Sequence, residues 1–146
     1  MIGRGGARRR RDTESGVSAI EFVLLTPLLF FLIFATVQFA IYFFARHVAI
    51  AAAQEGDRVA RAEAANPAEN WSADATDKAR GWINQLAPSL LVLDPVNGVS
   101  AKSNQNGNDW TVSVTVSAHL PSLLFWTDMS VTESSTGPVE RFIPDN

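Results

Sequence analysis

Hydrophobic positions are concentrated in one long run near the N-terminus. Residues 22–45 carry no charge, and most of them are Leu, Ile, Val or Phe. A membrane-spanning helix needs roughly 20 such residues, and their favourable insertion energies outweigh the polar Thr26, Thr36 and Gln38. The run also contains Pro27, which membrane helices tolerate. The pattern therefore predicts one transmembrane helix.

A stripe of small residues continues the helical pattern beyond this run. Ala49, Ala52, Gly56 and Ala60 recur at helical spacing. The sequence thus predicts a single helix over about residues 18–63. Small residues allow another element to pack closely, so the stripe either contacts a neighbouring subunit or seats the protein's own globular head.

A second, shorter helix is expected next. Asn66 can cap a helix whose first position is Pro67, and Pro88 ends the pattern. The residues predicted to share its buried face are Trp71, Ala75, Ala79, Trp82, Ile83 and Leu86. The two tryptophans are interpreted as core residues.

The remaining pattern is that of a small sheet. Residues 110–119 alternate strictly between apolar and polar, as a strand with one buried face does. Asn-Gly pairs at 97–98 and 106–107 signal turns. Neighbouring strands are expected around 92–93 or 99–102 and near 129–133. The fold class predicted is α+β, with a long N-terminal transmembrane helix, a short second helix and a small antiparallel sheet.

The connection at residues 120–126 is unusually apolar, with the sequence Leu-Pro-Ser-Leu-Leu-Phe-Trp. Connections between strands generally run over the surface and are polar. This segment is therefore either a short turn that covers the core or a surface for a partner.

Charge sets the orientation of the chain. Five arginines precede the apolar run, whereas Arg46 is the only basic residue close behind it. Basic residues favour the cytoplasmic side, so we expect a cytoplasmic N-terminus in the inner (cytoplasmic) membrane and a single pass. The expected regions are a disordered basic leader at 1–16, a transmembrane helix at 17–45, an extracytoplasmic helix extension at 46–65 and an extracytoplasmic α+β head at 66–146.

Two other export signals fit less well. A cleaved secretory signal would have an apolar core of about 7–15 residues and a small-x-small site, and the run here is longer. A twin-arginine signal would need an apolar stretch directly after Arg8–Arg11.

From Arg46 onward the chain carries a net charge of −5, with seven basic and twelve acidic residues. No broad basic face is expected, and hence no nucleic-acid partner.

The sequence shows few residues suited to catalysis or metal binding. There is no cysteine, which excludes disulfides and thiolate ligands. His47 and His119 have no second ligand at metal spacing, so neither a metal nor a cofactor is expected. No pair of acidic residues stands out as a general acid and base. A non-enzymatic protein is predicted, with a membrane-anchored hydrolase as the remote alternative.

One carboxylate stands at the mouth of the apolar run. Glu21 directly precedes Phe22, and a charge at the edge of hydrocarbon is costly unless it reaches water or a cation. It is either a hydrated acid favoured by the helix dipole near the N-terminus, or a group with a partner inside the membrane.

The residues around Glu21 bear on that choice. The segment at 16–22 reads Gly-Val-Ser-Ala-Ile-Glu-Phe and resembles the processing site of type IV pilin-like proteins. The resemblance implies that a prepilin peptidase cuts after Gly16, which leaves Val17 as the new N-terminus. Glu21 would then pair with the terminal amine of a neighbouring subunit and set the register between helices.

Within that group the chain is most similar to the TadE-like family of tight-adherence (Flp) pilus assembly proteins. The resemblance includes the processing segment, Pro27, the Ala-Ala-Ala-Gln-Glu-Gly-Asp-Arg run at 51–58 and a weaker echo at 137–142. Asp57 stands where relatives more often have a small residue.

The resemblance implies a pilin-like fold and a structural role. The chain is longer than the major Flp pilin, which favours a minor pilin or pseudopilin. Its implied partners are membrane lipid, other pilin-like subunits, the pilus assembly machinery and a prepilin peptidase. The alternative from a different class is an uncleaved single-pass anchor that carries a protein-interaction module.

Overall fold

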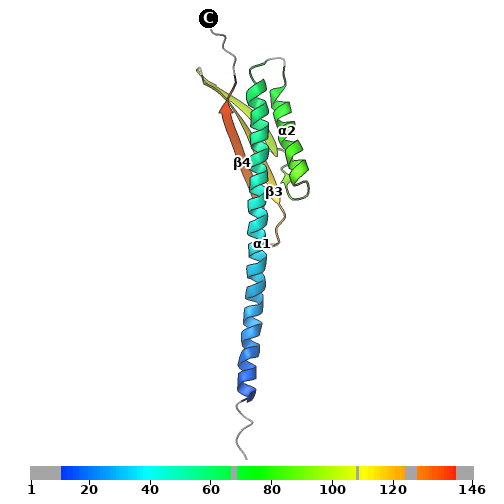
Figure 1. Ribbon diagram of the computed structural model, residues 1–146, viewed down its shortest axis with the longest axis vertical. Coiled ribbons are helices and arrows are strands. Elements are labelled where there is room, and N and C mark those ends of the chain that lie inside the picture. The colour runs from blue at the N-terminus through cyan, green and yellow to red at the C-terminus, as the bar shows by residue number, and fades with distance from the viewer. Residues whose placement is uncertain (1–10, 67–68, 108, 124–127, 141–146) are drawn as a thin grey trace, which may run out of the picture. The chain divides into compact units, whose positions relative to one another are not determined.

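In the computed structural model, the chain is described over residues 11–66, 69–107, 109–123 and 128–140, with side chains from residue 18 onward. The chain forms two compact units, Met1–Val37 and Gln38–Asn146. The helix α1 (Arg11–Glu63) belongs to both (Figure 1). The predicted α+β class is confirmed, with a long apolar helix, a short second helix and a four-stranded antiparallel sheet.

Among the described residues, the first unit consists of the N-terminal part of α1, up to Val37. The segment Ser18–Glu63 contains a window with a mean hydropathy of 2.4, none of which is buried. One long apolar helix of this kind near the N-terminus indicates single-pass membrane anchoring. Its large side chains are exposed along the first unit, from Ile20 to Val37.

α1 begins earlier than the pattern predicted. It starts at Arg11 rather than near residue 18, so the expectation of a disordered leader is wrong for residues 11–15. No glycine or proline interrupts these residues, which is consistent with a helical backbone. The end of α1 at Glu63 confirms the predicted end.

The sheet of the second unit is built around one long central strand, β3 (Asp109–Leu120). β4 (Met129–Pro138) pairs along one edge of β3. The short β1 (Val92–Leu93) and β2 (Val99–Asn106) follow each other along the opposite edge, and all pairs are antiparallel. The predicted strands are confirmed, and β4 extends five residues beyond its predicted end.

Both predicted turns are present. Gly107 lies in the tight β2–β3 hairpin with a φ of 62°, which glycine adopts without strain. Between β1 and β2, the carbonyl of Gly98 accepts a hydrogen bond from the Ser117 amide at 2.8 Å. This contact keeps the interrupted edge attached to β3.

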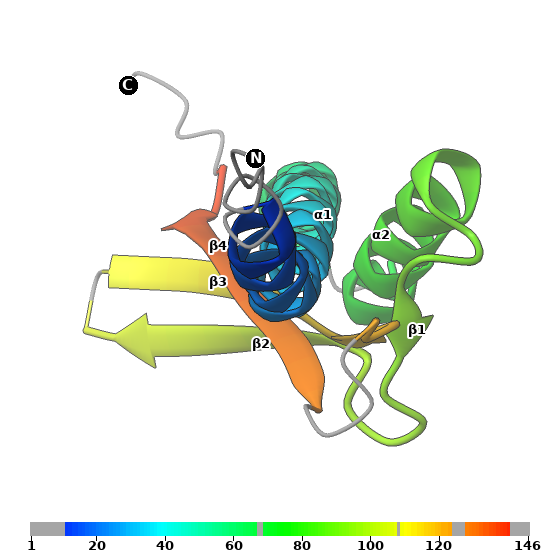
Figure 2. The same ribbon diagram turned by 90° about the horizontal axis from the view of Figure 1, so that it is seen from below.

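The core lies on one face of the sheet. The buried residues of β3 alternate in the predicted pattern, at Val112, Val114, Val116 and Ala118. The part of α1 in the second unit and the helix α2 (Trp71–Leu86) lie next to each other over this face (Figures 1 and 2).

α2 differs from its prediction in where it begins and in the burial of its last apolar residue. It begins at Trp71, not at residue 67, and the Asn70 side chain makes no capping bond. Ala75, Ala79 and Ile83 are buried, and Trp71 and Trp82 pack half-buried against them. Leu86 was predicted to join this face, but it is 49% exposed. The helix ends there, before Pro88 as predicted.

Candidate functional site

The predicted processing residues lie near the start of α1. Gly16 and Val17 are helical, five residues and four residues before Glu21. The Glu21 side chain is exposed in the first unit. A carboxylate there is available to water, to a lipid headgroup or to a cation on another chain.

The predicted small-residue stripe lies beneath the protein's own head. Ala49, Ala52 and Ala60 are 0% exposed. Gly56 is so closely covered that an added Cβ would lie 2.8 Å from the Ala75 carbonyl oxygen and 3.0 Å from Val114. Of the two alternatives left open by the sequence, the structure shows the head seated on the stripe.

A buried polar group stands directly beside this stripe. Asp57 is only 1% exposed. Its Oδ2 accepts a hydrogen bond from the Ser135 hydroxyl at 3.0 Å. The Arg61 Nε lies 3.3 Å from the same oxygen. A buried carboxylate is tolerated when it is paired and hydrogen-bonded in this way. Asp57 therefore joins α1 to β4.

The same junction brings the C-terminal echo of the family resemblance onto α1. The Arg61 side chain crosses Gly137 so closely that a Cβ there would lie 2.5 Å from the arginine Cδ. The Glu140 amide donates to the Arg61 carbonyl at 3.0 Å. Sequence reasoning noted both segments but not that they meet; residues 141 and 142 of the echo lie outside the described residues.

Gln38 is the first residue of the second unit, and both the nitrogen and the oxygen of its side-chain amide form hydrogen bonds. Its Nε2 donates to the Pro121 carbonyl at 3.3 Å and to the Met129 sulfur at 2.9 Å. Its Oε1 accepts from the Leu123 amide at 2.8 Å. Gln38 is 5% exposed, although the sequence reading treated it only as a tolerated polar residue of the span.

Arg46, the one basic residue close behind the apolar run, forms an ion pair with β4. Its Nε lies 2.7 Å from a carboxylate oxygen of Glu133. The hydrogen bond with Glu133, followed by the charge of that carboxylate, raises the pKa of Arg46 above its ordinary value. The pair adds a further polar attachment of α1 to β4.

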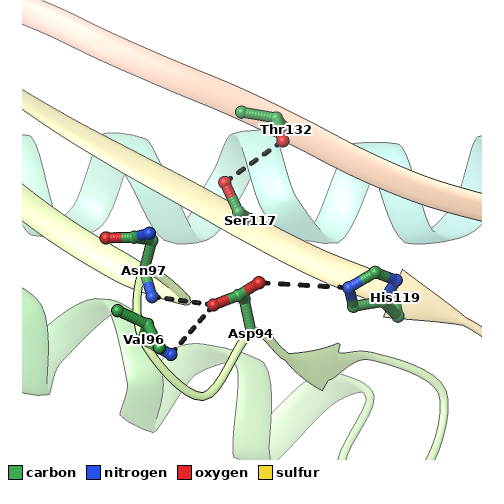
Figure 3. A network of polar contacts seen from close by, with 6 residues as sticks. All are labelled: Asp94, Val96, Asn97, Ser117, His119 and Thr132. Carbon is green, nitrogen blue, oxygen red and sulfur yellow. Dashed lines mark hydrogen bonds and ion pairs between the residues drawn. The ribbon is translucent and has the colours of Figure 1, made fainter.

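A polar network covers the β1–β2 turn (Figure 3). The Asp94 Oδ1 accepts hydrogen bonds from the amides of Asn97 and Val96, which hold the pKa of Asp94 below its ordinary value. His119 lies 4.0 Å from Oδ2, while Ser117 hydrogen-bonds to Thr132 instead of the histidine. The geometry is that of a capped turn, because the carboxylate is committed to backbone amides.

Three carboxylates meet where α1 ends and α2 begins, which the sequence reading missed. Oxygens of Glu63, Glu69 and Asp74 lie within 4.8 Å of one another. Burial, followed by the charges of Asp74 and Glu69, raises the pKa of Glu63 above its ordinary value. A proton on Glu63 relieves this repulsion.

Most of α1 matches a known protein family. Residues 16–58 match the family model described as TadE-like protein. This match confirms the TadE-like resemblance over residues 16–58, whereas the echo at 137–142 lies outside it. The TadE-like family is a pilus-associated structural family and suggests involvement in Tad pilus assembly. Curated proteins and solved structures gave no significant match.

The TadE-like match bears differently on the two units. It covers the whole apolar part of α1 after Gly16, together with most of the small-residue stripe. Ala60, Arg61, α2 and the sheet follow its end. The family resemblance therefore resides in the anchor and in the helix surface on which the head is seated.

Proposed function

We propose that the chain is a minor pilin or pseudopilin-like component of a tight-adherence (Flp) pilus assembly system, with a structural, non-catalytic role. The observation that carries the proposal is the TadE-like match over residues 16–58. It begins at the glycine expected at a prepilin cut and includes Glu21 at the expected fifth position of the mature chain.

The exposure of α1 supports the same proposal. Along the first unit its apolar side chains have no cover from the chain itself, as at Leu24 and Phe31, which are 70% and 54% exposed. Lipid covers such a surface in the membrane, and the corresponding helices of neighbouring subunits would cover it in an assembly. The arginine-rich start favours a cytoplasmic N-terminus in the inner membrane, with the second unit on the far side.

Glu21 would set the register between subunits in this account. After cleavage, the amine of Val17 carries a positive charge, and a carboxylate buried in lipid is stabilised by such a partner. Glu21 is exposed, so the described residues of its own chain do not cover its carboxylate.

An uncleaved membrane anchor with an interaction head is the second candidate. One observation favours it: Gly16 lies inside α1, five residues after the helix begins. A peptidase needs access to an unwound backbone, because in a helix the carbonyls are engaged in hydrogen bonds. Processing would therefore require the first turns of α1 to open.

N-terminal sequencing of the protein from membranes of its own cells separates the two candidates. Wild-type protein is expected to start at Val17, and a Gly16→Leu variant to keep its leader. Gly6→Leu, which changes a glycine outside the expected cut, serves as the matched control and should be processed normally. An intact leader on the wild-type chain would favour the static anchor.

A further inference from the structure

The head contacts α1 at a level that a bilayer would still cover. Counted from Phe22, the first unit supplies sixteen uncharged residues before it ends at Val37. A span needs roughly 20 residues at 1.5 Å each to cross about 30 Å of hydrocarbon. A span that starts at Phe22 therefore extends past Gln38, to about residue 41, and the head is already attached to Gln38.

The exposed surface of α1 agrees with this count. Phe39 is 64% exposed and Phe43 is 51% exposed, although both belong to the second unit. Both therefore leave an apolar surface of α1 uncovered within the second unit, and the next charged residue along the helix is Arg46. Within the second unit, α1 thus keeps an exposed apolar side next to Gln38, the residue that binds the head.

The contacts of Gln38 suit an environment without water. A side-chain amide in hydrocarbon is costly unless its donors and acceptor are paired within the protein. Pro121, Leu123 and Met129 supply these partners, and Gln38 in turn satisfies one carbonyl and one amide of the segment after β3. The described part of this segment, residues 121–123, is named the Gln38-bound loop.

The outer side of the loop is apolar. Leu123 is 44% exposed and Pro121 is also exposed, so these two residues do not form the core-covering turn that was one of the two alternatives for this connection. Neither carries a charge that would exclude it from lipid. We propose that the Gln38-bound loop inserts into the bilayer beside α1, with lipid acyl chains as its partner, and so fixes the head against the membrane surface.

Spin labels on single cysteines test this insertion, because the chain has no cysteine of its own. The full chain would carry a nitroxide at Leu123→Cys, at Leu28→Cys as a reference on the anchor, or at Ser103→Cys as a reference on the exposed end of β2. In phosphatidylcholine vesicles, collision rates with oxygen and with a water-soluble nickel complex report depth.

The expected result is an oxygen-to-nickel collision ratio at Leu123 that approaches the ratio at Leu28 and exceeds the ratio at Ser103. A ratio equal to that of Ser103 would place the loop in water and overturn the proposal. Protection from both reagents would mean that protein, such as a second copy, covers the loop, which would also overturn it.

A Gln38→Leu variant tests what holds the loop in place. Without the amide, the Pro121 carbonyl and the Leu123 amide lose their partner and should move toward water. The Leu123 label should then shift toward the ratio at Ser103, and an unchanged depth would contradict the role of Gln38. Insertion of the loop requires only that α1 spans the membrane. If the spin labels show no insertion, the pilus proposal is unaffected, because N-terminal sequencing tests it separately.

Discussion

The two halves of α1 are opposite in character although they form one helix. Residues 20–37 are mostly large, apolar and exposed, whereas the buried positions of residues 45–60 are mostly alanine and glycine and are covered by the sheet and α2. Large side chains suit a surface whose cover is fluid lipid, while small ones allow solid elements to approach the backbone. The difference shows that the large apolar side chains of the first half are open to lipid or other subunits, whereas the head occupies the small-residue surface of the second half.

The largest expected effect comes from filling the closest contact of the covered half. A methyl group at Gly56 would lie 2.8 Å from the Ala75 carbonyl oxygen, which belongs to the backbone of α2. Overpacking of this kind costs about 1–3 kcal/mol, against roughly 1 kcal/mol gained in helix propensity. Gly56→Ala is expected to lower the urea midpoint of the full chain in detergent, followed by tryptophan fluorescence.

Gly81 provides the matched control on α2. Nothing lies within 4 Å of the position of its Cβ, so Gly81→Ala should raise stability by about 0.5–1 kcal/mol. If Gly56→Ala were as stable as Gly81→Ala, the close seating of the head on α1 would be wrong.

An intermediate effect is expected at the junction of α1 with β4. Asp57→Ala removes the acceptor of the Ser135 hydroxyl and the carboxylate paired with Arg61, and the loss of a hydrogen bond to a charged group costs about 1.5–3 kcal/mol. The urea midpoint of the Asp57→Ala variant should fall clearly. The helical circular dichroism signal that comes from the anchor should not change.

Asp77→Ala controls for the loss of a carboxylate as such. Asp77 lies 3.7 Å from Arg80 in an exposed pair, and pairs of this kind contribute between about 0 and 1 kcal/mol. Equal midpoints for the two variants would mean that the Asp57 junction does not hold β4 on α1.

The smallest effect is a change in pH dependence at the end of the covered half. The pKa of Glu63 is raised in the folded chain by burial and by its acidic neighbours. Its stabilising contribution is therefore complete below the unfolded pKa of about 4.3 and is lost as pH rises through the higher folded value.

Glu63→Gln removes this loss, so it should be more stable than the wild type at pH 7, by about 0.5 kcal/mol or less for a group so near the surface. The gap should close as the pH falls to 4, which urea unfolding at several pH values would show. A gap that widens on acidification would have the wrong sign for a raised pKa.

The helix, the strands and their faces could be predicted because their signals are local. The alternation at residues 110–119 identified β3 and its buried side, and the small-residue spacing identified the surface of α1 on which the head sits. The start of α2 was predicted wrongly because a favourable Asn-Pro pair does not ensure that a helix begins there; it begins at Trp71.

The polar contacts could not be predicted in the same way. Gln38 and its partner Leu123 are 85 positions apart in the chain, and Asp57 and Ser135 are 78 apart. Such pairs depend on how the sheet packs on α1, and a local sequence pattern does not predict tertiary contacts of this kind. Asp57 was noticed as an unusual residue for the resemblance, but its partners could be found only in the structure.

Thiol accessibility along α1 tests the central contrast most directly. Single cysteines at Phe31 and Ala52 would be treated with a membrane-impermeant maleimide in intact vesicles, first in buffer, then in urea, then in detergent. Since head and lipid provide the cover, Ala52→Cys should react only after urea unfolds the head, and Phe31→Cys only after detergent removes the bilayer. Reaction of Ala52→Cys in buffer, or of Phe31→Cys before detergent, would contradict the division of α1 into a lipid-covered and a head-covered half.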